Sequence, residues 1–310
     1  MKRPNKQSKK PSIAFQSDIV IDENGEVYIS FLGPELLHLI DKDIKPIPSR
    51  DSHKWIPPII DELSLNSSEY QQCNICPRSC GFDRTKMPHP LCGDDKLRVS
   101  NFGISFGDEG IISGAGGSGV IFLSGCPLTC PSCINKEKVH TQGEEVGPNE
   151  FIDLIKTLAD KNVSNIQILS PTVHLPNLRP IFKSLKDSKF PLPIALKTSG
   201  HDLPDQISKL RGLVDIFIPD LKPCFNFEWS KEARIEKNYP KLFEDSINEM
   251  FRQLGPPRFS KAGEILSGIV IRYVKPPFLT SDQEVKTMEF LNSYQDRAFV
   301  SILDNYVIQK

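Results

Sequence analysis

From residue 111 onward, short apolar runs rich in β-branched residues alternate with segments of helical periodicity. Six runs are predicted to be strands, over residues 120–123, 166–169, 194–197, 216–221, 268–274 and 299–303. The helical spacing is clearest at Phe151, Leu154, Ile155, Leu158 and Ala159, with Asn149 as the expected N-cap. Strands that alternate with helices pair in parallel through crossover connections. We therefore expect an α/β fold, a partial (β/α)6 TIM-like barrel, with an open doubly wound sheet as the alternative.

The chain before this region has a different character. Residues 1–10 contain five Lys or Arg and no acidic residue, so residues 1–17 are expected to form a disordered basic tail. Two apolar runs, 19–21 and 27–29, flank Asn24-Gly25 and predict a hairpin. A short helix is expected over 34–40 and a Pro-rich linker over 46–58. We thus divide the chain into the tail, an N-terminal cysteine-rich extension over 18–104 and the core barrel over 105–310.

Composition narrows the classes of function. The 310 residues include 38 Lys and Arg against 39 Asp and Glu, a formal charge of −1, so no overall charge attracts nucleic acid or anionic lipid. No apolar run approaches the roughly 18 residues of a membrane span, and no signal-peptide pattern opens the chain. A cytoplasmic protein is expected. The eight cysteines form two tight groups and one single residue, a distribution typical of metal or cluster ligands instead of a disulfide scaffold.

The second group of cysteines directly follows the first strand of the predicted barrel. Cys126, Cys130 and Cys133 have the spacing C-x3-C-x2-C. Three thiolates on one loop can bind three irons of a [4Fe-4S] cluster, since soft thiolate suits iron–sulfur centres. The fourth iron is then free to bind S-adenosylmethionine, and one electron from the cluster splits its sulfonium C–S bond. The alternative is a zinc knuckle, although structural zinc takes four protein ligands and this loop offers three.

Several motifs in order carry a resemblance to a known family. They include Cys73-Asn74-Ile75-Cys76-Pro77-Arg78, Phe122-Leu123-Ser124-Gly125-Cys126, Thr198-Ser199-Gly200 and Pro219-Asp220-Leu221-Lys222. The chain from Cys73 to about Tyr306 resembles the radical S-adenosylmethionine (radical SAM) superfamily, in particular the branch similar to pyruvate formate-lyase activating enzymes. The resemblance implies an oxidoreductase that cleaves S-adenosylmethionine reductively and abstracts hydrogen from an unknown substrate, with a glycyl-radical-type protein as one candidate. It also implies an electron donor such as flavodoxin or ferredoxin.

The fourth predicted strand carries the candidates for holding S-adenosylmethionine. Alternation puts Asp220 and Lys222 on the face opposite Phe217 and Leu221, so their side chains should point into the barrel. The resemblance implies that they contact the methionine carboxylate, and an internal ion pair is the structural alternative. Residues at the ends of the third strand and the cysteine loop can contact the same ligand or only stabilise turns. The candidate cofactor-binding residues are therefore Asp220, Lys222, Thr198, Ser199 and Asn135.

The end of the second strand, Ser170-Pro171-Thr172, lacks the glycines of the family, and three single positions also depart from the family pattern. Ser132 stands where an aromatic residue usually packs near the adenine, Val173 where the branch has His, and Tyr273 where related enzymes have a His near the fifth strand. These departures motivate the alternative function, a catalytically impaired zinc or iron–sulfur protein on the same barrel. His174 and His201 follow strand ends, where either proton transfer or a turn explains them.

The first cysteine group lies in the N-terminal extension. Cys73, Cys76, Cys80 and Cys92 have the spacing C-x2-C-x3-C-x11-C, and four thiolates complete a tetrahedral site. Either zinc or a second, fully ligated iron–sulfur cluster satisfies this number of ligands. A zinc site would fix the extension against the barrel and contribute to folding. The remaining cysteine, Cys224, is expected to be a free thiol.

Overall fold

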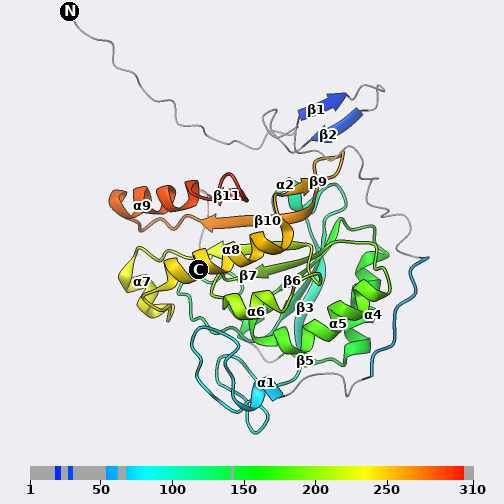
Figure 1. Cartoon of the computed structure of the whole chain (residues 1–310), viewed down its shortest axis with the longest axis horizontal. Helices are drawn as coiled ribbons and strands as arrows, with labels where there is room; N and C mark the ends of the chain where they lie inside the picture. The colour runs from blue at the N-terminus through cyan, green and yellow to red at the C-terminus, as the bar shows by residue number, and fades with distance from the viewer. Residues whose placement is uncertain (1–17, 22–26, 31–53, 62–67, 141–142, 304–310) are drawn as a thin grey trace, which may run out of the picture.

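The computed structural model describes residues 18–21, 27–30, 54–61, 68–140 and 143–303 (Figure 1). The expected tail over 1–17, the helix over 34–40 and residues 46–53 of the expected linker lie outside the described residues. The predicted hairpin strands are present as β1 (Asp18–Ile21) and β2 (Val27–Ser30), which pair antiparallel with Val20 opposite Tyr28.

A nine-stranded sheet forms the centre of the described chain. Six of its strands are parallel and neighbour one another in chain order: β4 (Ser118–Leu123), β6 (Asn165–Leu169), β7 (Ile194–Thr198), β8 (Ile216–Leu221), β10 (Ile265–Val274) and β11 (Phe299–Leu303). These are the six predicted strands. Antiparallel β3 (Arg98–Ser105) and β5 (Glu144–Glu145) extend the β4 edge, and β9 (Arg258–Phe259) pairs with β10. A doubly wound sheet reverses its strand order at a switch point, so the uninterrupted order from β4 to β11 excludes that alternative.

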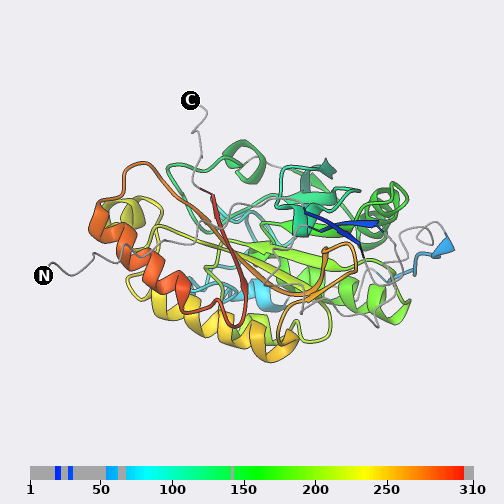
Figure 2. The same ribbon diagram turned by 90° about the horizontal axis from the view of Figure 1, so that it is seen from above.

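The connections between the parallel strands contain the longer helices. They are α4 (Pro148–Ala159), α5 (Leu175–Asp187), α6 (Pro204–Ser208), α8 (Tyr239–Leu254) and α9 (Ser281–Asn292). Figure 2 shows α8, in gold, and α9, in orange-red, side by side along the sheet, and Phe243 packs against Phe290 with ring centroids 6.0 Å apart. The shorter helices are α1 (Ser68–Gln71), α2 (Gly110–Ser113), α3 (Lys136–Val139), the 3-10 turn η4 (Thr172–His174) and α7 (Phe227–Glu232).

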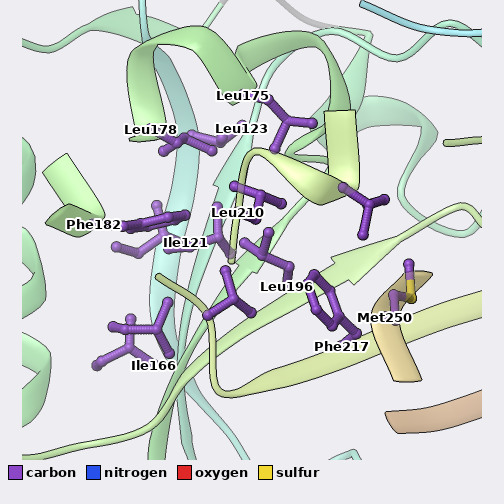
Figure 3. Close-up of a cluster of buried hydrophobic side chains, with 14 of the residues drawn as sticks. Ile121, Leu123, Ile166, Leu175, Leu178, Phe182, Leu196, Leu210, Phe217 and Met250 are labelled. Carbon is purple, nitrogen blue, oxygen red and sulfur yellow. The ribbon is translucent and has the colours of Figure 1, made fainter. Parts of the chain in front are cut away.

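The two faces of the parallel sheet bury different sets of side chains. Alternate residues such as Ile121, Leu196 and Phe217 face the helices and form the main core with them (Figure 3). The opposite face carries a smaller apolar cluster, formed by Ile111, Ile112, Ala195, Ile216, Ile218, Phe259, Ile265 and Val270. The second cluster lies toward the amino ends of the strands, which leaves the carboxyl ends of that face for polar residues.

Two sequence expectations about helices and boundaries are corrected. Asn149 was expected to be the N-cap of α4, but Gly147 occupies that position, because Pro148 has the fixed φ that suits the first helical residue. The Asn149 side chain instead accepts a hydrogen bond from the Ile60 amide (2.8 Å) and donates one to the Ile60 carbonyl (2.9 Å). The expected domain boundary at residue 105 cuts through β3, which is part of the large sheet.

The segment 54–61 is attached to the α/β body. Trp55 packs edge-on against Phe190, with ring centroids 4.8 Å apart, and its indole N–H donates to the Ser188 carbonyl at 3.2 Å. Of residues 54–58 in the expected linker, Trp55 is buried, whereas Ile56 is 82% exposed, so the segment is anchored to the body at Trp55 alone within this range. Within the described residues, no helix combines the length and the apolarity needed to cross a bilayer.

Candidate functional site

The cysteine loop begins where β4 ends, and a glycine sets its path. Gly125 has φ +94°, and a Cβ atom there would lie 2.6 Å from the carbonyl oxygen of Cys92. Only glycine tolerates both this backbone conformation and this approach. The loop is also fixed by backbone hydrogen bonds from Cys126 N to Leu91 O (3.0 Å) and from Thr129 N to Ala233 O (3.1 Å). The first cysteine group thus lies directly against the loop of the second.

The three thiols of this loop, Cys126, Cys130 and Cys133, are partly buried and interact with one another. Burial raises the pKa of Cys126 to about 12, and the neighbouring thiolates Cys130 and Cys133 add to that rise. Burial also raises the pKa of Cys130, opposed by the nearby Lys222 ammonium. Without a metal the Cys126 and Cys130 thiols stay protonated at neutral pH, so binding of iron must release their protons.

A cavity of about 430 Å³ opens beside the cysteine loop at the carboxyl ends of the parallel strands. All six parallel strands contribute to its wall, through Val120, Phe122, Leu169, Lys197, Asp220, Leu221, Arg272, Val274 and Leu303, and the cysteine loop adds Cys130, Ser132, Cys133, Ile134 and Asn135. Its volume lies in the range of small-molecule sites, and the carboxyl ends of strands are where β/α folds place their sites. A larger groove of about 780 Å³ runs between β3 and α4, but no cysteine lines it.

Asp220 and Lys222 point into this cavity, as alternation along β8 predicts. Lys222 Nζ lies 3.4 Å from Asp220 Oδ2. Burial alone would lower the pKa of Lys222, but the Asp220 carboxylate, with a smaller contribution from the sulfurs of the cysteine loop, outweighs it, so the pKa is raised. The ammonium group therefore remains charged and faces the thiols.

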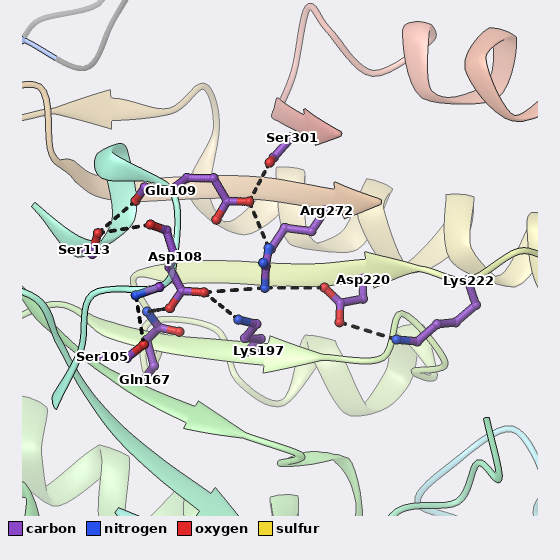
Figure 4. A network of polar contacts seen from close by, with 11 residues as sticks. Ser105, Asp108, Glu109, Ser113, Gln167, Lys197, Asp220, Lys222, Arg272 and Ser301 are labelled. Atoms are coloured by element: carbon purple, nitrogen blue, oxygen red, sulfur yellow. Dashed lines mark hydrogen bonds and ion pairs between the residues drawn. The ribbon is translucent and has the colours of Figure 1, made fainter. Parts of the chain in front are cut away.

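A network of buried charges continues from Asp220 across the floor of the cavity (Figure 4). Arg272 is at its centre, with Nε 2.9 Å from Glu109 Oε1 and Nη1 3.5 Å and 4.0 Å from carboxylate oxygens of Asp108 and Asp220. Lys197 Nζ donates to Asp108 Oδ1 at 2.7 Å. Burial favours protonation of Asp108 and Asp220, but the surrounding cations outweigh it and hold the pKa of both carboxyls below the usual value.

Sequence reasoning missed four members of this network, Asp108, Glu109, Lys197 and Arg272. Lys197 and Arg272 lie on the same strand face as Ala195 and Val270, so the alternation that identified Asp220 could also have identified them. Asp108 and Glu109 come from the loop that leads into α2, and no motif marks them.

The remaining predicted cofactor residues divide into two groups. Asn135 lines the cavity next to Cys133. Thr198 and Ser199 are not among the residues that line it: Thr198 is buried, and its hydroxyl accepts a hydrogen bond from the Gly200 amide at 3.1 Å. The Thr198 hydroxyl thus stabilises the turn after β7, which was the structural alternative for this residue.

Of the three departures from the family pattern, only Ser132 lines the cavity. Val173 is buried, and its carbonyl accepts a hydrogen bond from Arg84 Nη1 at 2.8 Å. Tyr273 faces the helix layer, while its neighbour Arg272 faces the cavity. The substitutions at 173 and 273 therefore leave the cavity wall unchanged.

The two candidate histidines also lie away from the cavity. His174 is buried, with Nε2 2.5 Å from the Ser124 carbonyl oxygen, and burial, reinforced by Arg84, lowers its pKa to about 4. His201 is fully buried and contacts the Glu236 carboxylate. Neither side chain lines the cavity, so neither is placed for proton transfer to a molecule bound there.

In the first cysteine group, Cys73, Cys76 and Cys92 are buried and Cys80 is exposed. Burial raises the pKa of Cys76 to about 11 and that of Cys92 to about 12. Across the described part of the chain, no three or more His, Cys, Asp or Glu side chains converge on a point that would suit a single metal ion. Cys224 is a half-buried thiol whose pKa burial raises to about 12.

Comparison with known proteins gives one family match. Residues 112–217, which contain the C-x3-C-x2-C loop, match the family described as a 4Fe-4S single cluster domain. In such a cluster each thiolate binds a different iron, so the thiols surround the cube without converging on one ion. Cys126, Cys130 and Cys133 all lie within the matched residues.

Among solved structures, the chain is similar to Streptococcus suis SuiB bound to precursor peptide SuiA, at 13% identity and a TM-score of 0.41. The similarity covers 58% of this chain and 37% of that one, so the chain spans well under two thirds of the SuiB structure. No curated protein matches the chain.

Proposed function

We propose that this protein is a radical SAM enzyme whose [4Fe-4S] cluster is held by Cys126, Cys130 and Cys133. The observation that carries the proposal is a three-thiol loop, within the matched 4Fe-4S segment, that opens onto a cavity of about 430 Å³ at the carboxyl ends of six parallel strands. The uninterrupted strand order also supports a partial barrel as the fold. When bound, the cluster supplies the electron that cleaves S-adenosylmethionine and so starts hydrogen abstraction from the substrate.

The side chains of the cavity account for recognition of S-adenosylmethionine. Lys222 presents a charged donor for the methionine carboxylate, and Asp220, whose Oδ1 makes no hydrogen bond within the protein, presents an acceptor for the amino group. Apolar residues such as Phe122, Leu169 and Trp229 line the same cavity and exclude water. Asn135 adds an amide next to the cluster loop.

The mouth of the cavity supports a protein substrate. Ile134, which lines the cavity, is 66% exposed, and Phe278, which follows the lining residue Pro277, is 41% exposed. Exposed apolar side chains beside a cavity are typical of surfaces that contact another protein. We assign these side chains to contact with an apolar segment of a protein substrate, for which a glycyl-radical-type protein is one candidate, and assign the electron to a flavodoxin or ferredoxin.

Anaerobic reconstitution with iron and sulfide tests the proposal. The reduced wild-type protein should convert S-adenosylmethionine to 5′-deoxyadenosine, whereas Cys133→Ala should not. Cys224→Ala is the matched control, because it removes a thiol outside both cysteine groups and should leave product formation unchanged. Iron-loaded wild-type protein that forms no 5′-deoxyadenosine would refute the proposal in favour of an iron–sulfur protein without this activity.

A further inference from the structure

The outer edge of β3 is paired over only a small part of its length. Its inner edge pairs with β4 from Val99 to Ser105, and the register is regular from Asn101 onward. On the outer edge, β5 pairs with Arg98 and Val99 alone. Along residues 100–105, the described part of the chain therefore places no strand against this edge. Such an edge presents backbone N–H and C=O groups to any further strand that approaches it.

The side chains of this edge do not protect it from pairing. Proteins usually guard an open edge with charged residues or Pro, and residues 100–105 contain neither. Phe102 is 48% exposed and Ile104 41%, and Phe106, which directly follows the strand, is 67% exposed. Phe102 is the cross-strand partner of Ile121, a core residue, so Phe102 and Ile104 lie on the face of the sheet that the helices cover. Exposed apolar side chains in a row are typical of a contact surface.

On this face, the groove of about 780 Å³ lies beside β3. One wall comes from the start of β3 and the other from α4. The lining residues are Val99, Ser100, Asn101 and Phe102 of β3, Gly143, Glu144 and Val146 around β5, and Glu150, Asp153, Leu154 and Thr157 of α4. An extended segment on the edge of β3 would therefore have α4 alongside it, and Phe102 and Leu154 would offer it apolar contact.

The charged side chains of the groove are all acidic. They are Glu144, Glu150 and Asp153, and no Lys, Arg or His is among the described residues that line it. The Glu150 carboxylate accepts a hydrogen bond from the Gly147 amide at 2.8 Å. Within the described residues, the carboxylates of Glu144 and Asp153 have neither a hydrogen bond nor an ion pair. The groove thus favours a basic partner, and it disfavours a second copy of the same edge, which would bring the same three acids.

We propose that the outer edge of β3 and the adjoining groove bind an extended, basic segment of a partner protein, which joins the sheet as a further strand. The backbone of residues 100–105 makes the strand hydrogen bonds. Phe102 and Leu154 contact apolar side chains of the segment, and the three acids of the groove pair with its Lys or Arg side chains. No residue lines both this groove and the cavity at the cysteine loop, so the inference does not depend on the radical chemistry.

Fluorescence anisotropy with the full-length protein tests the chemistry of the partner. The probe is a labelled peptide of about eight residues in which Lys and Val alternate, which is long enough to cover the open edge. Two matched peptides are compared with it: one has Glu in place of every Lys, and one has all of its amides N-methylated. Both should bind at least about tenfold more weakly, because the first lacks the charge and the second the hydrogen-bond donors. Equal binding of either peptide would overturn the proposal.

The acids are tested by a double variant with a matched control. Glu144→Gln/Asp153→Asn should weaken binding of the Lys-Val peptide about five- to tenfold, since each exposed ion pair contributes up to about 1 kcal/mol. Glu289→Gln/Asp296→Asn removes two exposed acids outside the groove and should leave the affinity unchanged. Equal affinities of the two double variants would overturn the role of the groove.

The edge itself is tested by a charge placed on it. Phe102→Lys should weaken binding of the Lys-Val peptide more than about tenfold, whereas Val285→Lys, at a 55% exposed position on α9, should not change it. Circular dichroism shows whether each variant is folded. In the wild type, the peptide should slow hydrogen exchange of the backbone amides of residues 100–105. Binding without this protection would overturn addition of a strand, whatever the variants show.

Two other occupants of the edge give different results. Residues 1–10 contain five Lys or Arg. A full-length variant with Ser at these five positions should bind the Lys-Val peptide as wild type does, and tighter binding would assign the groove to this segment and overturn the proposal. In sedimentation analysis, a wild-type dimer that Phe102→Lys dissociates would assign the edge to a second copy and would also overturn it.

Discussion

Replacing Arg272 by Met tests whether the floor of the cavity is stabilised by balanced buried charges. In the wild type, three cationic side chains form ion pairs with three carboxylates: Arg272, Lys197 and Lys222 with Asp108, Glu109 and Asp220. The Arg272 side chain is 10% exposed and that of Glu109 3%, so water replaces little of a lost interaction. Met keeps much of the side-chain volume and removes the charge together with the hydrogen bond from Arg272 Nε to Glu109. The variant therefore leaves Glu109 as a buried carboxylate without its cation.

Removal of one partner from a buried ion pair costs about 3–5 kcal/mol of folding free energy. At about 2.1 cal/mol/K of unfolding entropy per residue, the 310 residues give roughly 0.65 kcal/mol/K, so the melting temperature should fall by roughly 5–8 °C. The assay is thermal and urea unfolding of iron-free, reduced protein, followed by circular dichroism. Lys183→Met is the control, because its ion pair with Asp187 is 68% and 65% exposed and should contribute at most about 1 kcal/mol.

The loss should also depend on pH and on Glu109. The pKa values of Asp108 and Asp220 are lowered in the folded protein, so their contribution is present above the unfolded-state value of about 4 and is lost as the pH falls below it. The deficit of Arg272→Met should therefore shrink below pH 4. Adding Glu109→Gln should recover part of the loss at pH 7. A loss no larger than that of Lys183→Met, or no recovery in the double variant, would refute the charge-balance argument.

Three further outcomes follow from single positions. Lys222→Met should weaken binding of S-adenosylmethionine to the iron-loaded protein roughly ten- to a hundredfold in anaerobic calorimetry, because a charged hydrogen bond is worth about 1.5–3 kcal/mol; unchanged affinity would remove Lys222 from the binding site. Gly125→Ala should lower iron content and stability more than Gly212→Ala. Both glycines have positive φ, but only at Gly125 would the added Cβ atom meet a close neighbour, the Cys92 carbonyl. Equal losses in the two variants would contradict this. The pKa of His174 is lowered to about 4 in the folded protein, so the unfolded protein binds a proton at this residue at higher pH than the folded protein does. Between pH 6.5 and pH 4, wild type should therefore lose about 3 kcal/mol more stability than His174→Gln in urea unfolding. Parallel dependence of stability on pH in the two proteins would contradict the burial argument.

Local patterns were sufficient for the strands and much of the topology. The predicted bounds of β8 and β11 match the structure residue for residue, because both are rich in β-branched and other apolar residues. The choice between a singly and a doubly wound sheet depends on which strands pair, and pairing is decided by packing between distant segments. The misplaced N-cap at Asn149 has the same origin, since its side chain is bound by Ile60, 89 residues earlier.

The site was predicted as far as it depends on single strands. Alternation along β8 placed Asp220 and Lys222 in the cavity, and the cysteine spacing selected the loop that lines it. The direction of the Thr198 hydroxyl depends instead on the turn that follows β7, where the Gly200 amide is its donor. Residue type and position at a strand end do not show whether a side chain lines the cavity, as Asp220 does, or stabilises a turn, as Thr198 does.

The acids on the cavity floor show what charge balance adds to pattern reading. Alternation alone puts Lys197, Lys222 and Arg272 on the inner face with one carboxylate, that of Asp220, which is a net charge of about +2 in a partly buried space. Balancing that charge requires two further acids, but the sum does not identify them. The acids lie in the loop before α2, and their partners on the strands are 89 and 163 residues away in the sequence. Asp108 and Glu109 meet the requirement.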